Sequence, residues 1–215
     1  MPAWLLSAIC IALFLTHSWM MFFHRQKMRA EPSDKPQDPL FTKWSQHLVF
    51  AGILIAQLAM LYRRILMAYD IWPLGFKPYD LLLIELLDFL PLPASDLTLI
   101  LGASIFFAGY SLRAWAIRIL GRFFTFEIGI RSKHQIIESG PYRWIRHPSY
   151  TGYLLMHIGM GLAYSSLFFI LGLGIGTLVF FGLRIHQEER MLVRHFGPSY
   201  ERYMRRTKRL VPKVF

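Results

Sequence analysis

The stretch SYTGYLLMHIGMGLAYSSLFFILGLGIGTLVFFGL, residues 149–183, contains no charged residue over 35 positions. A helix needs about 20 apolar residues to cross the roughly 30 Å hydrocarbon layer of a bilayer, so this stretch is too long for one crossing. It has about the length of two crossings joined by a tight turn, which we expect near Ser165 and Ser166. The stretch therefore predicts a helical hairpin in a membrane.

The predicted hairpin is rich in glycine, and Gly172 and Gly176 form a pair of small residues one helical turn apart. Such pairs allow the backbones of membrane helices to approach closely. Glycine is also generally common in spanning helices, which is the alternative explanation of the same pattern.

Three further apolar stretches precede the hairpin, at 2–23, 46–62 and 97–116. The first begins MPAWLL without a cation, which favours a retained span over a signal peptide. The third carries Arg113 and Arg118 near its end, where their long side chains can reach lipid headgroups. The segment 79–90 is too short and too acidic to span, so we expect it at the interface. The predicted fold is an all-α polytopic membrane bundle of about five transmembrane helices.

The composition agrees with a membrane protein, because 54% of the 215 residues are hydrophobic while the formal net charge is +11. In a soluble chain this excess of cations would indicate nucleic acid, but beside long apolar runs anionic lipid and membrane orientation explain it better. With five spans, 20 of the 24 Lys and Arg fall on one side, in 24–45, 117–147 and 184–215. The positive-inside rule then predicts a cytoplasmic C-terminus, in the inner (plasma) membrane if the source is bacterial.

Polar residues gather on both sides of the hairpin, in 121–150 and in 184–214. A short hairpin brings its two ends together, so these segments are predicted to share one cytoplasmic site. His147-Pro148 predicts an extended step before a helix start, which places Arg146 and His147 at a helix N-terminus that favours anions. The alternative is that the arginines of this segment only hold lipid phosphates.

In the second segment, Arg184 and Glu188 are four residues apart and share one face if the helix continues past the membrane. Glu188 and Glu189 are consecutive acids in a cationic region and offer a partner for a cation or for sugar hydroxyls. The alternative is an amphipathic tail whose acids pair with neighbouring arginines. Gly197-Pro198 is expected to end the helix.

Sequence motifs for other chemistries are absent, since no GxGxxG follows a strand and there is neither a Walker-type loop nor an HExxH. The histidines of the C-terminal half form no i,i+4 pair, so we expect no metal site.

Two motifs, GPYRWIRHPSYTG at 140–152 and EERMLVRHFGPSYERY at 188–203, resemble the isoprenylcysteine carboxyl methyltransferase family of integral-membrane enzymes. The similarity covers about 95 residues, 121–215. It implies S-adenosylmethionine as the cofactor, in a cytoplasmic pocket roofed by the C-terminal helix, with a lateral opening for a lipophilic acceptor. The residues that the resemblance places at the cofactor are His134, Tyr142, Arg146, His147, Tyr150, Glu188 and Glu189, and those that it makes catalytic are Arg184, facing the acceptor, and Glu188.

Methyl transfer from a sulfonium to an anionic acceptor needs little acid–base help, so catalysis would rest on alignment and desolvation. If the acceptor is a carboxylate, Arg184 can hold it as a fork while Glu188 fixes the arginine. The resemblance leaves the acceptor open among an isoprenoid or fatty carboxylate, a lipid amine and a small thiol. It also leaves the oligomeric state open.

Two other functions remain alternatives. Sterol-reductase-like membrane enzymes share a similar hairpin and use NADPH, but they typically have Asn in place of Ser149 and lack the acidic pair. The other alternative is a membrane scaffold with a degenerate pocket. The chain is expected to have two parts. Residues 1–118 form the N-terminal transmembrane helices, and residues 119–215 form a methyltransferase region that ends in an amphipathic helix.

Overall fold

The computed structural model describes residues 95–124, 128–130 and 133–212, with a few isolated positions (8, 9, 11, 12, 15, 16, 55, 58 and 62) nearer the N-terminus. Apart from those positions, the predicted spans 2–23 and 46–62 and the predicted interfacial helix 79–90 lie outside the described residues. The described elements are helical: α4 (Asp96–Leu120), the short 3-10 helices η3 (Gly121–Phe123) and η4 (Gly140–Arg143), α5 (Pro148–Ala163), α6 (Leu167–Phe196) and α7 (Pro198–Arg206).

Helix α4 begins at a capping box. The hydroxyl of Ser95 accepts the N–H of Thr98 at 3.1 Å, and the Thr98 hydroxyl accepts the N–H of Ser95 at 3.1 Å. Asp96 in the first turn and Arg118 in the last turn complement the helix dipole. The predicted span 97–116 therefore corresponds to α4, which continues to Leu120.

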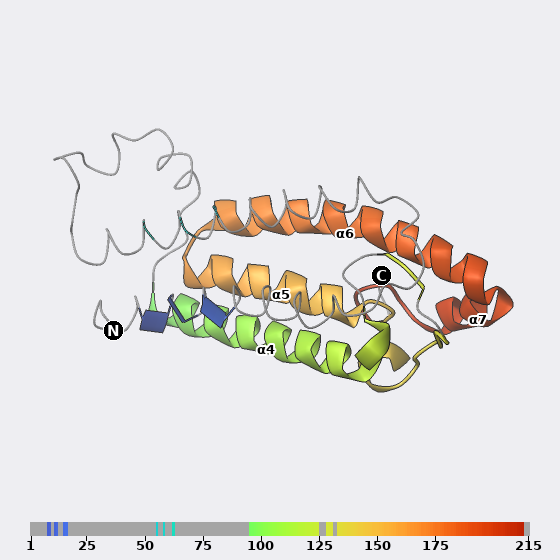
Figure 1. Cartoon of the computed structure of the whole chain (residues 1–215). Helices are drawn as coiled ribbons and strands as arrows, with labels where there is room; N and C mark the ends of the chain where they lie inside the picture. Colours follow the sequence, from blue (N-terminus) through green and yellow to red (C-terminus); the bar gives the residue numbers. More distant parts are fainter. Residues whose placement is uncertain are drawn as a thin grey trace.

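The predicted hairpin is confirmed. Helix α5 ends at Ala163 and α6 begins at Leu167, so the turn contains Ser165 and Ser166 as expected. Ser165 adopts a φ of 54° there, and its N–H donates to the carbonyl of Leu162 at 2.9 Å. Figure 1 shows the result, in which α5 lies between α4 and α6 and the three helices run side by side.

Among the described helices, α4 and α6 are the two that are long and apolar enough to cross a membrane. Helix α5 has 16 residues, or about 24 Å, which is shorter than the hydrocarbon layer. Helix α6 has 30 residues, more than one crossing needs, and it ends at Gly197-Pro198 as predicted. The C-terminal part of α6, beyond the length of one crossing, carries Arg184, Glu188 and Glu189.

Glycines bring the backbones of α4 and α5 into contact. A Cβ added at Gly102 would lie 2.6 Å from the carbonyl oxygen of Gly159, and one added at Gly109 would lie 2.6 Å from that of Gly152. Both distances are too short for any side chain, so each pair requires glycine. The close approach holds α5, and with it the N-terminal end of the hairpin, firmly against α4.

The expectation that Gly172 and Gly176 mediate close packing is not met in the described part of the structure. A Cβ at either position would meet no atom of the described residues within 4 Å. Among the described residues, the close glycine contacts are those of α5 against α4. Small-residue spacing alone does not reveal which helix face is turned toward a neighbour.

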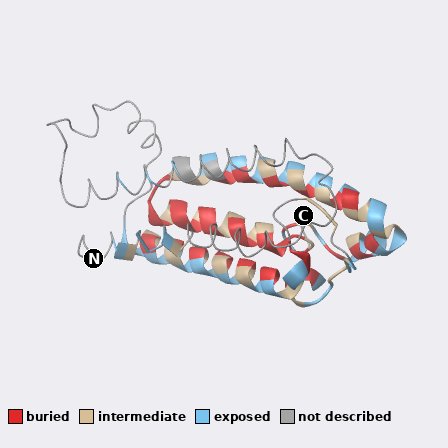
Figure 2. Ribbon diagram, in the orientation of Figure 1, coloured by how far each residue is buried: buried red, intermediate tan, exposed pale blue. Residues whose placement is uncertain are grey.

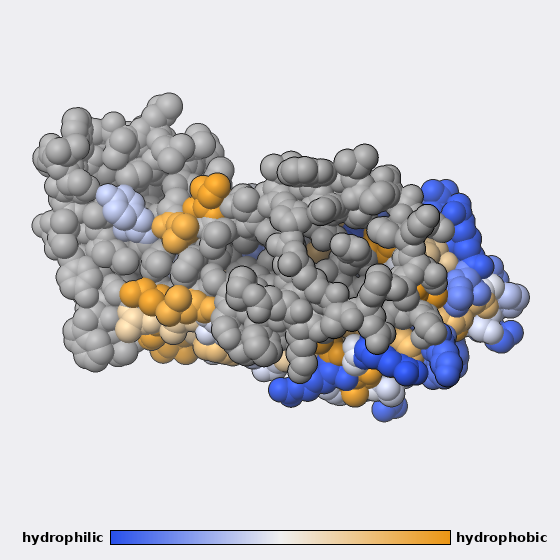
Figure 3. Space-filling view, in the orientation of Figure 1, coloured by the Kyte–Doolittle hydropathy of each residue, from blue (hydrophilic) through white to orange (hydrophobic). Residues whose placement is uncertain are grey.

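Helices α4 and α6 carry many exposed residues, while α5 is largely buried between them (Figure 2). Leu97, Ile100 and Phe107 of α4 and Ile175 and Val179 of α6 are all at least 47% exposed. A continuous apolar surface of this kind marks contact with lipid or with other helices. Hydrophilic residues gather instead at the end of the molecule where α7 lies (Figure 3).

Candidate active site

Backbone hydrogen bonds join the segment before the hairpin to the tail after it. The N–H of Arg146 donates to the carbonyl of Lys208 at 2.8 Å, and the N–H of His147 donates to that of Arg209 at 3.0 Å. The N–H of Lys208 donates back to the carbonyl of Trp144 at 3.2 Å. The two polar segments are therefore neighbours, as the hairpin predicted.

Side chains reinforce this junction. The hydroxyl of Thr151 donates to the carbonyl of Leu210 at 2.7 Å, and the buried hydroxyl of Tyr203 in α7 donates to the carbonyl of Tyr142 at 2.7 Å. Burial raises the pKa of Tyr203 above its ordinary value, so this hydroxyl stays protonated and remains a donor. The C-terminal tail, residues 203–210, is thus held against the first segment at both of its ends.

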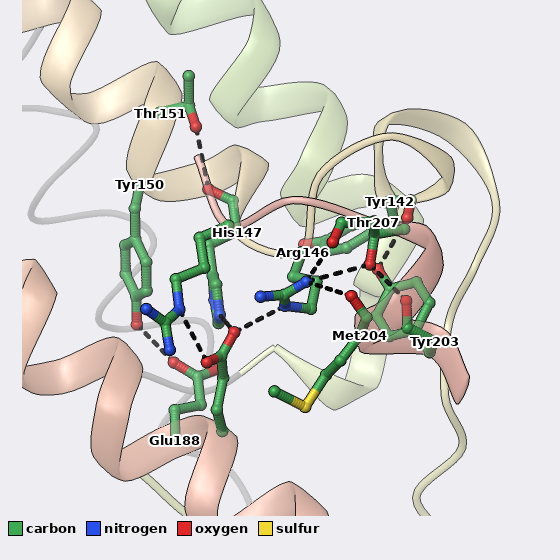
Figure 4. A network of polar contacts seen from close by, with 11 residues as sticks. Tyr142, Arg146, His147, Tyr150, Thr151, Glu188, Tyr203, Met204 and Thr207 are labelled. Atoms are coloured by element: carbon green, nitrogen blue, oxygen red, sulfur yellow. Dashed lines mark hydrogen bonds and ion pairs between the residues drawn. The ribbon is translucent and has the colours of Figure 1, made fainter. Parts of the chain in front are cut away.

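Arg146 lies at the centre of the polar network in Figure 4. Its Nη1 donates to the carbonyl of Met204 at 3.0 Å and to that of Thr207, and its Nε donates to Oε1 of Glu189 at 2.7 Å. These carbonyls belong to the last turn of α7 and the residue that follows it. Arg146 therefore anchors the tail, in addition to any role toward a ligand.

Glu189 is 3% exposed, and both of its carboxylate oxygens are engaged. Oε1 lies 2.7 Å from Nε of Arg146 and 3.4 Å from Nε2 of His147, while Oε2 accepts from Nε of Arg209 at 3.0 Å. Glu189 is not among the residues that line the cavity described below, although the resemblance places it at the cofactor. The structure places it behind the wall, where it supports Arg146 and His147.

Tyr150 lies between Arg184 and Glu188. Its hydroxyl accepts from Nε of Arg184 at 2.8 Å. The same hydroxyl donates to Oε2 of Glu188 at 2.8 Å (Figure 4). Its ring stacks on Phe181 with the ring centres 4.4 Å apart and on His147 at 5.5 Å. Arg184 and Glu188 share one helix face as predicted, and the tyrosine hydroxyl links them.

A cavity of about 1170 Å³, its open mouth included, is enclosed by α4, α5, α6 and the polar segments. Seven of the eight site residues predicted from the sequence line it: His134, Tyr142, Arg146, His147, Tyr150, Arg184 and Glu188.

The cavity follows α6 from Phe180 to Phe196, a distance of about 24 Å along the helix. Near Phe196, the ring of His134 stacks on Phe123 at 4.9 Å and meets Phe196 edge-on at 5.7 Å. Near Phe180 lie the charged residues around Tyr150. The cavity is thus elongated, with an aromatic end and a charged end.

Sequence reasoning missed Arg113, which it placed near lipid headgroups. The structure buries its side chain in the cavity wall, where Nη1 donates to the hydroxyl of Ser149 at 2.6 Å and to its carbonyl at 3.1 Å. A charged residue inside a spanning segment is itself a signal of a functional position, and that signal was present in the sequence. The sequence analysis also did not identify the aromatic residues of the cavity lining, because their position in space depends on how the helices pack. These residues are Phe123, Tyr153, Phe181, Tyr200 and Tyr203.

Comparison with known proteins agrees with this architecture. Residues 100–194 match the family model described as the isoprenylcysteine carboxyl methyltransferase (ICMT) family. The chain is similar to protein-S-isoprenylcysteine O-methyltransferase B of Arabidopsis thaliana, with 34% identity over 115 residues that cover 53% of this chain and 58% of the relative. It is also similar to the protein-S-isoprenylcysteine O-methyltransferase of Dictyostelium discoideum, with 32% identity over 104 residues, 47% of this chain and 44% of the relative. The chain therefore spans about half the length of these relatives.

Among solved structures, the fold resembles that of a eukaryotic intramembrane Ras methyltransferase, an isoprenylcysteine carboxyl methyltransferase. The TM-score is 0.55 and the sequence identity 24%, with 77% of this chain and 67% of that chain covered. At this identity the likeness concerns the fold alone, which is helical, as the sequence predicted.

Proposed function

We propose that this chain, whose residues 100–194 match the model of the isoprenylcysteine carboxyl methyltransferase family, transfers a methyl group from S-adenosylmethionine to a lipophilic acceptor in a membrane. The observation that carries the proposal is the Arg184–Tyr150–Glu188 arrangement in the wall of a cavity shared by the hairpin and the tail. It combines a cation for an anionic acceptor with a carboxylate beside it.

The lining residues fit S-adenosylmethionine, which combines an adenine ring, a carboxylate and a sulfonium. Aromatic side chains at the end near Phe196 suit the flat adenine. His147 and the start of α5 suit the carboxylate, because helix N-termini favour anions. Glu188 and the ring of Tyr150 suit a positive charge. When bound, the cofactor supplies an electrophilic methyl group.

The remaining predicted cofactor residues act on the shape of the pocket. Burial raises the pKa of the Tyr142 hydroxyl above its ordinary value, so it stays protonated, and it donates to the carbonyl of Ala116 at 3.4 Å. Arg146 and Glu189 hold the tail against the cavity. Glu189 is therefore proposed as a positioning residue. His134, Tyr142, Arg146, His147, Tyr150 and Glu188 line the cavity, and we propose that they contact the cofactor.

The acceptor is proposed to be a carboxylate, of which the S-isoprenylcysteine named for the relatives is the first candidate. A carboxylate is already ionised at neutral pH, so no side chain has to remove a proton. Arg184 holds and orients it, and the apolar walls exclude water. Orientation and desolvation together supply the catalysis.

We further propose that the protein is a multi-pass membrane protein of about five spans with its C-terminus and cavity on the cytoplasmic side. The division into 1–118 and 119–215 is part of this proposal, and among the described residues of the first unit Arg113 is the one that lines the cavity. Membrane lipids would then surround the apolar faces of α4 and α6.

The proposal is tested by incubating membranes that contain the protein with S-adenosylmethionine carrying a labelled methyl group. Protein, lipid and small-molecule fractions are then separated, and the fraction that carries the label names the acceptor class. Calorimetry on purified protein should show S-adenosylmethionine or its demethylated product bound with a Kd in the micromolar range. Binding of NADPH with no response to S-adenosylmethionine would instead indicate the reductase class.

A further inference from the structure

Arg113 of α4 is 6% exposed and lines the charged end of the cavity. Its Nη1 donates to both oxygens of Ser149, and its guanidinium carbon lies 5.0 Å from the centre of the Tyr153 ring. Its Nε is buried and has no hydrogen-bond partner among the residues that the structure describes. A buried donor without a partner is costly unless a ligand satisfies it.

Arginines outnumber carboxylates among the described residues that line the cavity. Among these described residues, the arginines are Arg113, Arg146 and Arg184, and the one carboxylate is that of Glu188. Arg146 is engaged by Glu189 behind the wall. A lining of this sign favours an anionic ligand over a cationic one.

Arg113 and Arg184 belong to the same end of the cavity. Ser149, which binds Arg113, is next in the chain to Tyr150, which binds Arg184. The guanidinium of Arg113 lies over the ring of Tyr153, which packs on Phe181, and Phe181 in turn stacks on Tyr150. Two guanidinium groups that line one end of a cavity form a suitable site for a group with delocalised negative charge, such as a carboxylate.

We propose that Arg113 is a second anion-binding residue of the acceptor site and that, together with Arg184, it selects acceptors whose methylated group is a carboxylate. This inference rests on the proposed function. In the reaction, a carboxylate oxygen forms a bond to the methyl carbon while the carbon–sulfur bond breaks and its electron pair stays on sulfur. The product is a neutral ester. Because the charge that both arginines recognise has disappeared, they favour the substrate over the product and promote release of the ester.

The test uses the full chain in detergent and two probes, N-acetyl-S-prenylcysteine and its carboxamide. The probes have nearly the same shape and differ in charge. Wild-type protein should bind the acid more tightly than the amide. In Arg113→Gln this preference should fall by about tenfold or more, the usual effect of losing a hydrogen bond to a charged group, while the Kd of S-adenosylmethionine changes little. The matched control is Arg118→Gln, which removes an exposed arginine from the same helix and should leave the preference unchanged.

Two more variants keep the inference testable if Arg113→Gln does not fold. Arg113→Lys retains the charge and should keep part of the preference for the acid. Arg184→Gln should also keep part of it, because Arg113 remains. An unchanged preference in Arg113→Gln, or its complete loss in Arg184→Gln, would overturn the inference. The proposed function fails separately, if wild-type protein methylates neither probe and does not bind S-adenosylmethionine.

Discussion

The Nε of Arg184 donates to the hydroxyl of Tyr150 at 2.8 Å, so a residue of α6 is oriented by a residue from the first turn of α5. The same hydroxyl donates to Glu188 at 2.8 Å. One tyrosine therefore sets the positions of both residues that we propose as catalytic.

Tyr150→Phe removes this hydroxyl and keeps the ring that stacks on Phe181 and His147. We expect kcat to fall about tenfold to a hundredfold, because hydrogen bonds to two charged groups are lost, at about 1.5–3 kcal/mol. The Kd of S-adenosylmethionine should change much less. Tyr110→Phe, in α4 and away from the cavity lining, is the control. An equal loss in both quantities would show that Tyr150 acts mainly on cofactor binding.

Arg184→Ala should abolish turnover while cofactor affinity stays close to that of the wild type, because the arginine faces the acceptor. Turnover is measured with labelled S-adenosylmethionine, and affinity by calorimetry. Arg190→Ala, an exposed arginine on the same helix, should affect neither quantity. If affinity falls as far as turnover, Arg184 belongs to the cofactor side of the cavity.

His147→Ala should weaken cofactor binding by several kcal/mol, since the change leaves a buried anion of the ligand without its partner. The matched control is His186→Ala, because His186 is exposed on α6 and does not line the cavity. Calorimetric titration with S-adenosylmethionine measures both. Unchanged affinity would assign His147 a purely structural role in the junction with the tail.

Glu189→Gln keeps the shape of a buried side chain and removes the charge that Arg146, Arg209 and the ring of His147 share. We expect a loss of about 3 kcal/mol in the free energy that holds the tail, because one member of a buried ion-pair network is neutralised. Hydrogen exchange at residues 203–210 should accelerate, and cofactor affinity should fall with it. Glu201→Gln, on an exposed position of α7, serves for comparison. Slow exchange retained in the variant would contradict the role of Glu189 as an anchor.

Gly159→Val should destabilise the helix pair, because a Cβ at this position would lie 2.4 Å from the backbone nitrogen of Phe106. The backbone cannot yield as a flexible side chain does, so we expect a clearly lower Tm or no folded protein. Gly182→Ala, on the open face of α6, should leave the Tm almost unchanged. Equal Tm values for the two variants would show that α4 and α5 do not need their close contact.

The hairpin and the meeting of its two polar ends were predictable, because both follow from one uncharged stretch and its length. The rotation of each helix about its own axis, which decides the direction of each side chain, was not predictable. Glu188 and Glu189 are neighbours in the sequence, but successive residues of a helix differ by about 100° in direction, so one faces the cavity and the other the tail. For the same reason the close glycine contacts between α4 and α5 were not predicted.

Arg113 shows a second limit of the sequence. A long cationic side chain near the end of a span can extend to the headgroups or turn inward, and spacing does not distinguish the two. The inward direction depends on Ser149 and Tyr153, which lie 36 and 40 positions further along the chain. Contacts at that separation come from the packing of α4 on α5, so no local pattern could have indicated them.

Residues 203–210 leave the ribosome after both helices of the hairpin, yet they pair with residues 142–151, which were synthesised before it. The pocket is consequently closed as one of the last steps in biogenesis, once α6 has been inserted and its C-terminal turns have emerged on the same side as the N-terminus of α5. A nascent protein halted within α6 would hold most of the lining residues and still lack a finished wall.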